Sequence, residues 1–294
     1  VVLFLLAVFG AFYYLTQHLQ FVLQYDALET GIRMLPLAGA VFVGSLLTGY
    51  LTPRIGMKAM IVAGMAGGTL ALVLLTQVDK SSSYGDFVAP LIALGLAIGL
   101  ALSPCTDAIM GAFPEEELGV GSAVNDTSQE LGGAIGIAIL GSLLSTSYSS
   151  NLSDATAGSE LPADALSQAQ DSVAAGYGVA EGIGDQARQL AEQAARVTDP
   201  QQAAQLQEQA DQLIDGAHQM AGAVSSSFAD AVAHTSLVGA VILGVGAVSV
   251  ALLMPGKGRS GEAGAESTTK AGVGIKASVV QEKEKEPEFT RSNS

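Results

Sequence analysis

The stretch FVAPLIALGLAIGLALSPCTDAIMGAF, residues 87–113, indicates the fold class of this chain most clearly. Its one charged side chain is that of Asp107. Apolar runs of at least ~18 residues are long enough to cross the hydrocarbon core of a bilayer as a helix. Further runs of this kind occur along the chain, and together they predict six membrane-spanning helices, at residues 1–23, 34–52, 59–78, 87–113, 118–144 and 231–254.

Composition supports the same fold class. Of the 294 residues, 49% are hydrophobic and only 14% are charged, which favours a lipid environment over water. The runs are long and rich in Gly and Ala, whereas barrel strands need ~10 alternating residues. We therefore predict an all-α membrane protein.

The sequence contains no motif of a soluble enzyme. Gly244-Val245-Gly246 imitates part of a phosphate-binding loop, but it lies inside an apolar run and follows no strand. The three histidines are too scattered in the sequence to form a metal site. We predict no catalytic residue, no metal and no cofactor.

A long polar segment, residues 149–230, separates the last two predicted spans. Residues 151–230 hold twelve acidic residues and two arginines, a net charge of −10 within a chain of net charge −15. Apolar residues recur at spacings of three and four on both sides of Asp199-Pro200, a typical N-cap and first helical residue. The first series is Ile183, Ala187, Leu190, Ala194 and Val197; the second is Leu206, Ala210, Leu213, Ala217, Met220 and Val224.

These series predict an Ala-rich helical hairpin over residues 183–224. Two interpretations remain open at this point. The hairpin is either an element that binds a partner or gates the protein, or a solvated insertion that packs on itself.

Basic residues predict the orientation in the cell membrane, because short cytoplasmic loops are enriched in Lys and Arg. Arg54 and Lys58 lie between the second and third predicted spans. The tail, residues 255–294, adds seven basic residues and has a composition typical of disorder. We expect this loop, the tail and both chain ends to be cytoplasmic, and residues 149–230 to be extracellular. The chain opens inside an apolar run, so we expect it to be the later part of a longer protein.

Ionisable side chains inside predicted spans are costly and mark candidate functional positions. Asp107 lies late in the fourth span, and Asp126 and Glu130 lie one helical turn apart on one face of the fifth. Carboxylates so close together in a low dielectric are suited to binding and releasing protons. We interpret these three as candidates for proton coupling.

Other polar and small residues suggest a cavity and close helix contacts. In the first span Tyr13, Tyr14, Gln17 and Gln20 combine aromatic surface with amide groups, as a cavity for amphipathic molecules requires. Asn125 joins these cavity candidates. Glycines at small-xxx-small spacing predict tight helix packing; these are Gly95, Gly99, Gly132, Gly133 and Gly136.

Two motifs resemble a known family. GYLTPRIGMK, residues 49–58, resembles the loop signature of the major facilitator superfamily, with Gly49, Arg54, Gly56 and Lys58 matching and Pro53 where Asp is usual. The stretches SPCTDAIMGAFP (103–114) and GVGSAVNDTSQELGGAIG (119–136) are similar to the EmrB/QacA-type drug:proton antiporters with fourteen spans. Those proteins usually have Arg where Gln129 stands.

The resemblance implies the second six-helix half of a transporter whose substrate path lies between two halves that rock. It implies proton-coupled export of amphipathic drugs or antibiotics. The implied partners are membrane lipid, a small amphipathic substrate, protons and the N-terminal half of the same transporter, with no nucleic acid. Two alternatives stay open: a facilitator without proton coupling, and a membrane-anchored interaction protein that acts through the hairpin.

Overall fold

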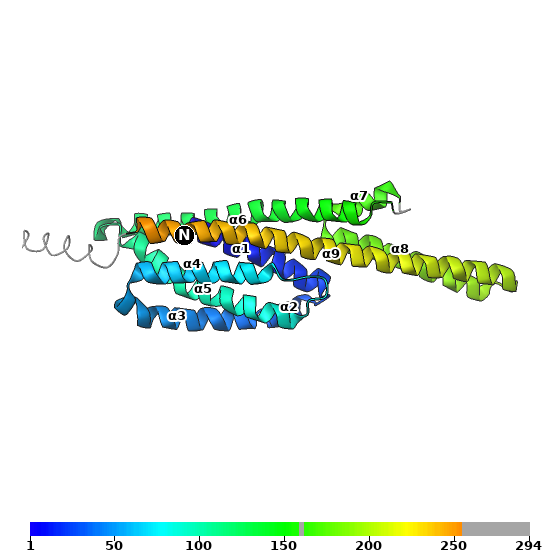
Figure 1. Ribbon diagram of the computed structural model, residues 1–294, viewed down its shortest axis with the longest axis horizontal. Helices are drawn as coiled ribbons and strands as arrows, with labels where there is room; N and C mark the ends of the chain where they lie inside the picture. Colours follow the sequence, from blue (N-terminus) through cyan, green and yellow to red (C-terminus); the bar gives the residue numbers. More distant parts are fainter. Residues whose placement is uncertain (159–161, 255–294) are drawn as a thin grey trace, which may run out of the picture.

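The computed structural model describes residues 1–158 and 162–254, and the predicted disordered tail lies outside them. The regular elements of the described residues are helical (Figure 1). In chain order they are α1 (Val2–Gln17), the π-helical turn η1 (His18–Val22), α2 (Ala27–Arg33), α3 (Leu35–Ile55), α4 (Met57–Leu75), α5 (Tyr84–Met110), the 3₁₀ turn η2 (Glu115–Glu117), α6 (Leu118–Ala155), α7 (Ala163–Asp171), α8 (Val173–Arg196) and α9 (Pro200–Leu253).

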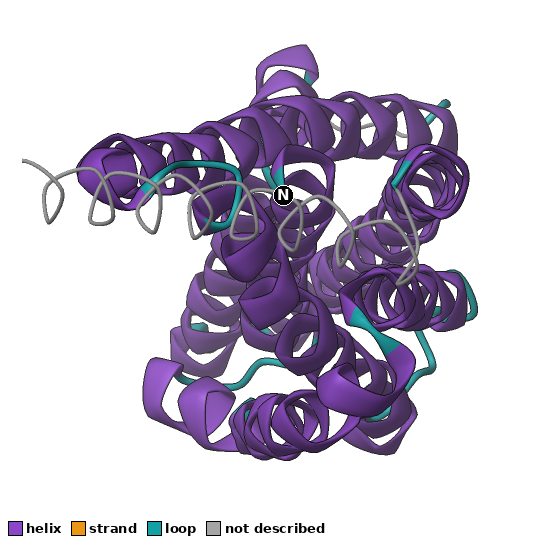
Figure 2. Cartoon of the chain, turned by 90° about the vertical axis from the view of Figure 1, so that its left-hand side faces the viewer, coloured by secondary structure: helices purple, strands orange, loops and turns teal. Residues whose placement is uncertain are grey.

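Six helical segments of the described residues are long and apolar enough to cross a membrane, which confirms the predicted all-helical class and number. They are Val2–Val22, Ala27–Ile55, Met57–Leu75, Tyr84–Met110, Glu115–Ala155 and Pro200–Leu253. Figure 2 shows these helices nearly end-on, as one bundle.

Two of the helices are much longer than their apolar runs. At 1.5 Å per residue, α6 with 38 residues and α9 with 54 are about 57 Å and about 81 Å long, against a hydrocarbon core of about 30 Å. Hydropathy marks only the apolar part of each, and neither helix is interrupted where the sequence turns polar. Both therefore extend past the rest of the bundle on one side (Figure 1).

Glycines allow the helices to approach closely. A Cβ at Gly136 would overlap the carbonyl oxygen of Leu6, so the backbones of α6 and α1 are in direct contact. Gly95 and Gly99 of α5 are placed in the same way against the carbonyl oxygens of Leu37 and Val41 in α3. These glycines fix which face of each helix is buried.

The loop that carries the family signature is a sharp turn. Gly56 ends α3 and precedes α4 with φ of 90°, a backbone conformation that favours glycine. The Arg54 guanidinium lies over the Tyr50 ring, 3.7 Å from its centroid, and donates to the Tyr50 carbonyl oxygen at 2.5 Å. Lys58 lies in the first turn of α4, so the turn presents positive charge.

Helices α8 and α9 pack side by side as a hairpin that projects from the bundle (Figure 1). Asp199 is the N-cap of α9, its carboxylate accepting from the Gln201 amide at 2.9 Å, and Pro200 is the first helical residue. Ala187, Ala194 and Ala210 are buried between the helices.

Near the bundle, the Tyr177 hydroxyl is 2.6 Å from that of Ser225. Burial raises the pKa of Tyr177, although this hydrogen bond opposes the rise. The phenol is therefore neutral at physiological pH and is held between α8 and α9. The hairpin and the last membrane-spanning helix thus form one continuous body.

Replacement of Gly136 by Ala is expected to lower the free energy of unfolding by roughly 1–3 kcal/mol, because the new methyl group forces α1 and α6 apart. Gly119→Ala is the matched control, since a Cβ there meets nothing within 4 Å and the same helix gains roughly 0.5–1 kcal/mol of propensity. Thermal unfolding of the purified protein in detergent measures both. Equal melting temperatures for the two variants would contradict the packing described.

Candidate functional site

A line of hydrophilic and small side chains runs along the exposed surface of α6. Every fourth residue from 126 to 154 is exposed. Consecutive residues at this spacing are neighbours on the helix surface, and the line they form winds around α6 by about 40° at each step. We call this set the hydrophilic stripe; it consists of Asp126, Glu130, Ala134, Ala138, Ser142, Thr146, Ser150 and Asp154. It contains no large apolar side chain and is about 42 Å long at 1.5 Å per residue.

The neighbouring exposed positions of α6 have the opposite character. Leu131, Ile135 and Ile139 are exposed at the same four-residue spacing, which suits contact with lipid. Carboxylates and hydroxyl groups facing hydrocarbon would lose their hydrogen bonds with water, at a cost of several kcal/mol for each charge. The hydrophilic stripe therefore faces water or protein, and the apolar positions face lipid.

Helix α1 places aromatic rings beside the stripe. Phe9 and Tyr13 are 44% and 42% exposed and lie one turn apart. A Cβ at Gly133 would be 3.4 Å from the Phe9 ring, and one at Gly141 would be 3.2 Å from the Tyr13 ring. The rings thus cover glycines of α6, and Gln17 continues their line as a half-buried side chain.

Phe9 is absent from the residues predicted from sequence. Its signal in the sequence is the four-residue spacing to Tyr13, which places both rings on one face of α1.

Other predicted cavity residues lie apart from this face. Tyr14 is fully buried, and its hydroxyl accepts a 2.9 Å hydrogen bond from Ser236 of α9. Asn125 is also buried, and its amide donates to the Asp126 carboxylate at 3.2 Å. Gln20 is half-buried in η1. The structure therefore brings Tyr13 and Gln17 together with Phe9, and places Tyr14 in the contact between α1 and α9.

The three acidic candidates divide between two helices. Asp126 and Glu130 share the hydrophilic stripe, whereas Asp107 is exposed near the end of α5. Within residues 1–158 and 162–254, no hydrogen bond or ion pair connects Asp107 to the other two. In the same part of the chain none of the three carboxylates forms an ion pair.

The predicted packing glycines of α6 all lie against α1. Gly132 and Gly136 contact the backbone of α1 near Val2 and Leu6, and Gly133 contacts the Phe9 ring. The side of α6 that these residues occupy is therefore closed by α1.

A fold with six helices long and apolar enough to cross a membrane is that of a multi-pass membrane protein. Residues 1–137 match the family model of the Major Facilitator Superfamily, so this part of the chain is similar to that superfamily of membrane transporters.

Several curated relatives match about half of the chain. The multidrug resistance protein Stp of Mycobacterium tuberculosis is 36% identical over 149 residues, which are 50% of this chain and 27% of the relative. The puromycin resistance protein of Streptomyces alboniger is 31% identical over 153 residues, 51% of this chain and 30% of the relative. The methyl viologen resistance protein SmvA of Salmonella typhimurium is 34% identical over 138 residues, 47% of this chain and 28% of the relative. The chain thus spans less than a third of each relative, and the matched half of the chain is similar to drug-resistance proteins.

The hairpin matches a different family model. Residues 177–229, which cover most of α8 and the first half of α9, match a family of unknown function, DUF6381. The hairpin is therefore a recognisable sequence unit in its own right.

Cysteine substitution tests which face of α6 meets water. The chain has one cysteine, Cys105, which Cys105→Ala removes. In that background we expect Ser142→Cys to react roughly tenfold or more faster than Ile139→Cys with a charged, membrane-impermeant thiol reagent, because thiolates form in water and not in hydrocarbon. Faster labelling at position 139 would mean that α6 is rotated from the orientation described.

Proposed function

We propose that this chain acts as one half of a proton-coupled exporter of amphipathic drugs or antibiotics, with the hydrophilic stripe of α6 facing the substrate path. The observation that carries the proposal is the exposure of Asp126 and Glu130 on one face of a membrane-spanning helix. An intramembrane carboxylate that faces the interior of a transporter is a candidate site for protons or cations.

The two carboxylates supply a charge for which protons and cationic substrates compete. They lie one turn apart, and like charges at this spacing repel each other. Either a proton or a bound cation relieves that repulsion. Binding of one therefore favours release of the other, which is the requirement for exchange.

The aromatic rings of α1 supply the apolar part of the binding surface. Phe9 and Tyr13 present exposed ring faces beside the stripe. Aromatic faces attract both flat apolar molecules and cations. Rings next to carboxylates suit flat organic cations such as methyl viologen, the compound after which the Salmonella relative is named.

The hydrophilic stripe requires a partner surface, and a second six-helix half of the same transporter fits this need. The relatives are more than three times as long as the matched segment. In major facilitator proteins the path lies between two halves that rock against each other. Direct backbone contact of α1 with α6 and of α3 with α5 lets this half move as a rigid body.

For orientation we propose that the hairpin is extracellular and that both ends of the described chain are cytoplasmic. The start of α1 and the end of α9 lie at the same end of the bundle, where Leu3 is near Gly246 (Figure 1). The Arg54 and Lys58 turn carries positive charge, which favours a cytoplasmic location.

Neutralising the carboxylates is the test of the proposed function. We expect Glu130→Gln and Asp126→Asn, made in the protein at its natural length, to slow pH-driven ethidium export from cells by roughly tenfold or more, because neither amide exchanges a proton. Glu116→Gln is the control, since Glu116 is exposed in η2 outside the stripe. Unchanged export in both stripe variants would remove these residues from the mechanism.

A membrane-anchored interaction protein is the second candidate, favoured by the separate family match of the hairpin. Replacement of residues 182–216 by a short Gly/Ser linker distinguishes the two, because it leaves the base of the hairpin in place. A carrier keeps most of its ethidium export, whereas an interaction protein loses its function with the hairpin. Loss of all export from a variant that still reaches the membrane would favour the second candidate.

A further inference from the structure

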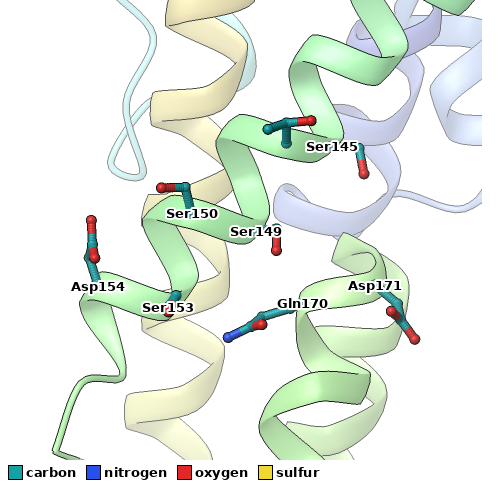
Figure 3. Close-up of a pocket in the computed structure, with 8 residues that line it drawn as sticks. Ser145, Ser149, Ser150, Ser153, Asp154, Gln170 and Asp171 are labelled. Carbon is teal, nitrogen blue, oxygen red and sulfur yellow. The ribbon is translucent and has the colours of Figure 1, made fainter.

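A second polar site lies where the hydrophilic stripe reaches the hairpin end of α6. A hollow of about 620 Å³ separates the last turns of α6 from α7. Its α6 wall consists of five hydroxyl-bearing residues between Ser145 and Ser153, together with Asp154, and its α7 wall is formed by Gln170 and Asp171. Figure 3 shows the Gln170 side chain extending from α7 toward Ser149 and Ser153, with Asp154 and Asp171 at opposite ends of the group.

A buried tyrosine positions the α7 wall. Tyr148 of α6 is 2% exposed, and its hydroxyl donates a 3.0 Å hydrogen bond to the carbonyl oxygen of Ala169. The Tyr148 ring meets Phe228 of α9 edge-on, with ring centroids 6.0 Å apart. Ala169 is itself fully buried, so the next residue, Gln170, is held facing α6. Tyr148 is therefore a positioning residue for the hollow.

The lining groups define the chemistry of a complementary ligand. Serine and threonine hydroxyls and the glutamine amide both donate and accept hydrogen bonds, whereas the two carboxylates only accept and carry negative charge. The lining includes no basic side chain and no large apolar side chain. A ligand that fits has hydroxyl groups and a positive charge, and an anion or a bare apolar ring does not fit.

We propose that this hollow is a subsite for the hydroxylated ammonium part of a substrate, such as an amino sugar attached to an aromatic body. The inference rests on the proposed function, because the hollow lies at the end of the hydrophilic stripe that also contains Glu130. The aromatic body of the substrate contacts Tyr13, which lies over Gly141, and the amino sugar reaches the serines. The insertion that contains α7 thus contributes directly to substrate selection.

The test compares two substrates that differ only in this part, with a third, unrelated cation as a reference. Doxorubicin carries an amino sugar on an anthraquinone, its aglycone doxorubicinone lacks the sugar, and ethidium is an amphipathic cation without hydroxyl groups. Export of all three is measured in cells that produce the protein at its natural length. The variants are Gln170→Ala and the pair Ser149→Ala with Ser153→Ala, and Gln193→Ala on the exposed surface of α8 is the control.

We expect both sets of variants to reduce doxorubicin export by roughly fivefold, the effect of one or two lost hydrogen bonds, while ethidium and doxorubicinone export change less than about twofold. Ser149→Thr retains a hydroxyl group and should restore doxorubicin export. Tyr148→Phe should raise the half-saturating doxorubicin concentration and leave that of ethidium unchanged.

Ethidium export by the same variants shows that they are folded. The doxorubicin and doxorubicinone results therefore decide whether the subsite exists. Equal loss of all three exports, or no loss of any, would overturn the subsite. Export of ethidium but not of doxorubicin by the unaltered protein would overturn the subsite and leave the proposed function standing. Export of none of the three by the unaltered protein would overturn both.

Discussion

The backbone contact between α1 and α6 fixes the rest of the site. Because Gly132 and Gly136 have no side chain, α6 lies directly against the backbone of α1 near Val2 and Leu6, and the rotation of α6 about its axis follows. That rotation places the hydrophilic stripe on the surface and sets the Phe9 and Tyr13 rings over Gly133 and Gly141. A side chain at position 136 would turn or displace α6 and with it every carboxylate and hydroxyl of the stripe.

The parts of the structure that depend on spacing along one helix could be predicted from the sequence. Uninterrupted apolar runs predicted six long helices, since each such helix satisfies its own backbone hydrogen bonds in lipid. The four-residue spacing of Asp126 and Glu130 places them on one face, and both are exposed on that face. The same rule applied to the whole of α6 would have revealed Ser142, Thr146 and Ser150 as the continuation of that line.

Features that depend on contacts between distant residues could not be predicted in this way. Tyr13 and Tyr14 are adjacent in sequence, yet one is exposed beside α6 and the other is buried against Ser236, 222 positions away. Apolar runs also give no helix ends, because α6 and α9 continue through polar sequence without a break. The contact of Tyr148 with Ala169, which brings Gln170 to α6, joins two elements on either side of a turn and has no periodic signal.

The acidic hairpin and the carboxylates of the hydrophilic stripe both attract cations. Residues 151–230 carry a net charge of −10, and the potential of such a surface raises the local concentration of cations and repels anions. The stripe ends among the serines of this region, and its carboxylates lie at both ends of the line. The acidic surface near Asp154 therefore favours cations over anions.

Proton flux through the reconstituted protein is the sharpest test of coupling by the hydrophilic stripe. In liposomes that contain the protein at its natural length and a pH-sensitive dye, addition of ethidium on one side should drive proton movement in the opposite direction. We expect this flux to be present in the unaltered protein and absent when Asp126→Asn and Glu130→Gln are combined. Proton flux of equal size in the double variant would contradict the role assigned to the hydrophilic stripe.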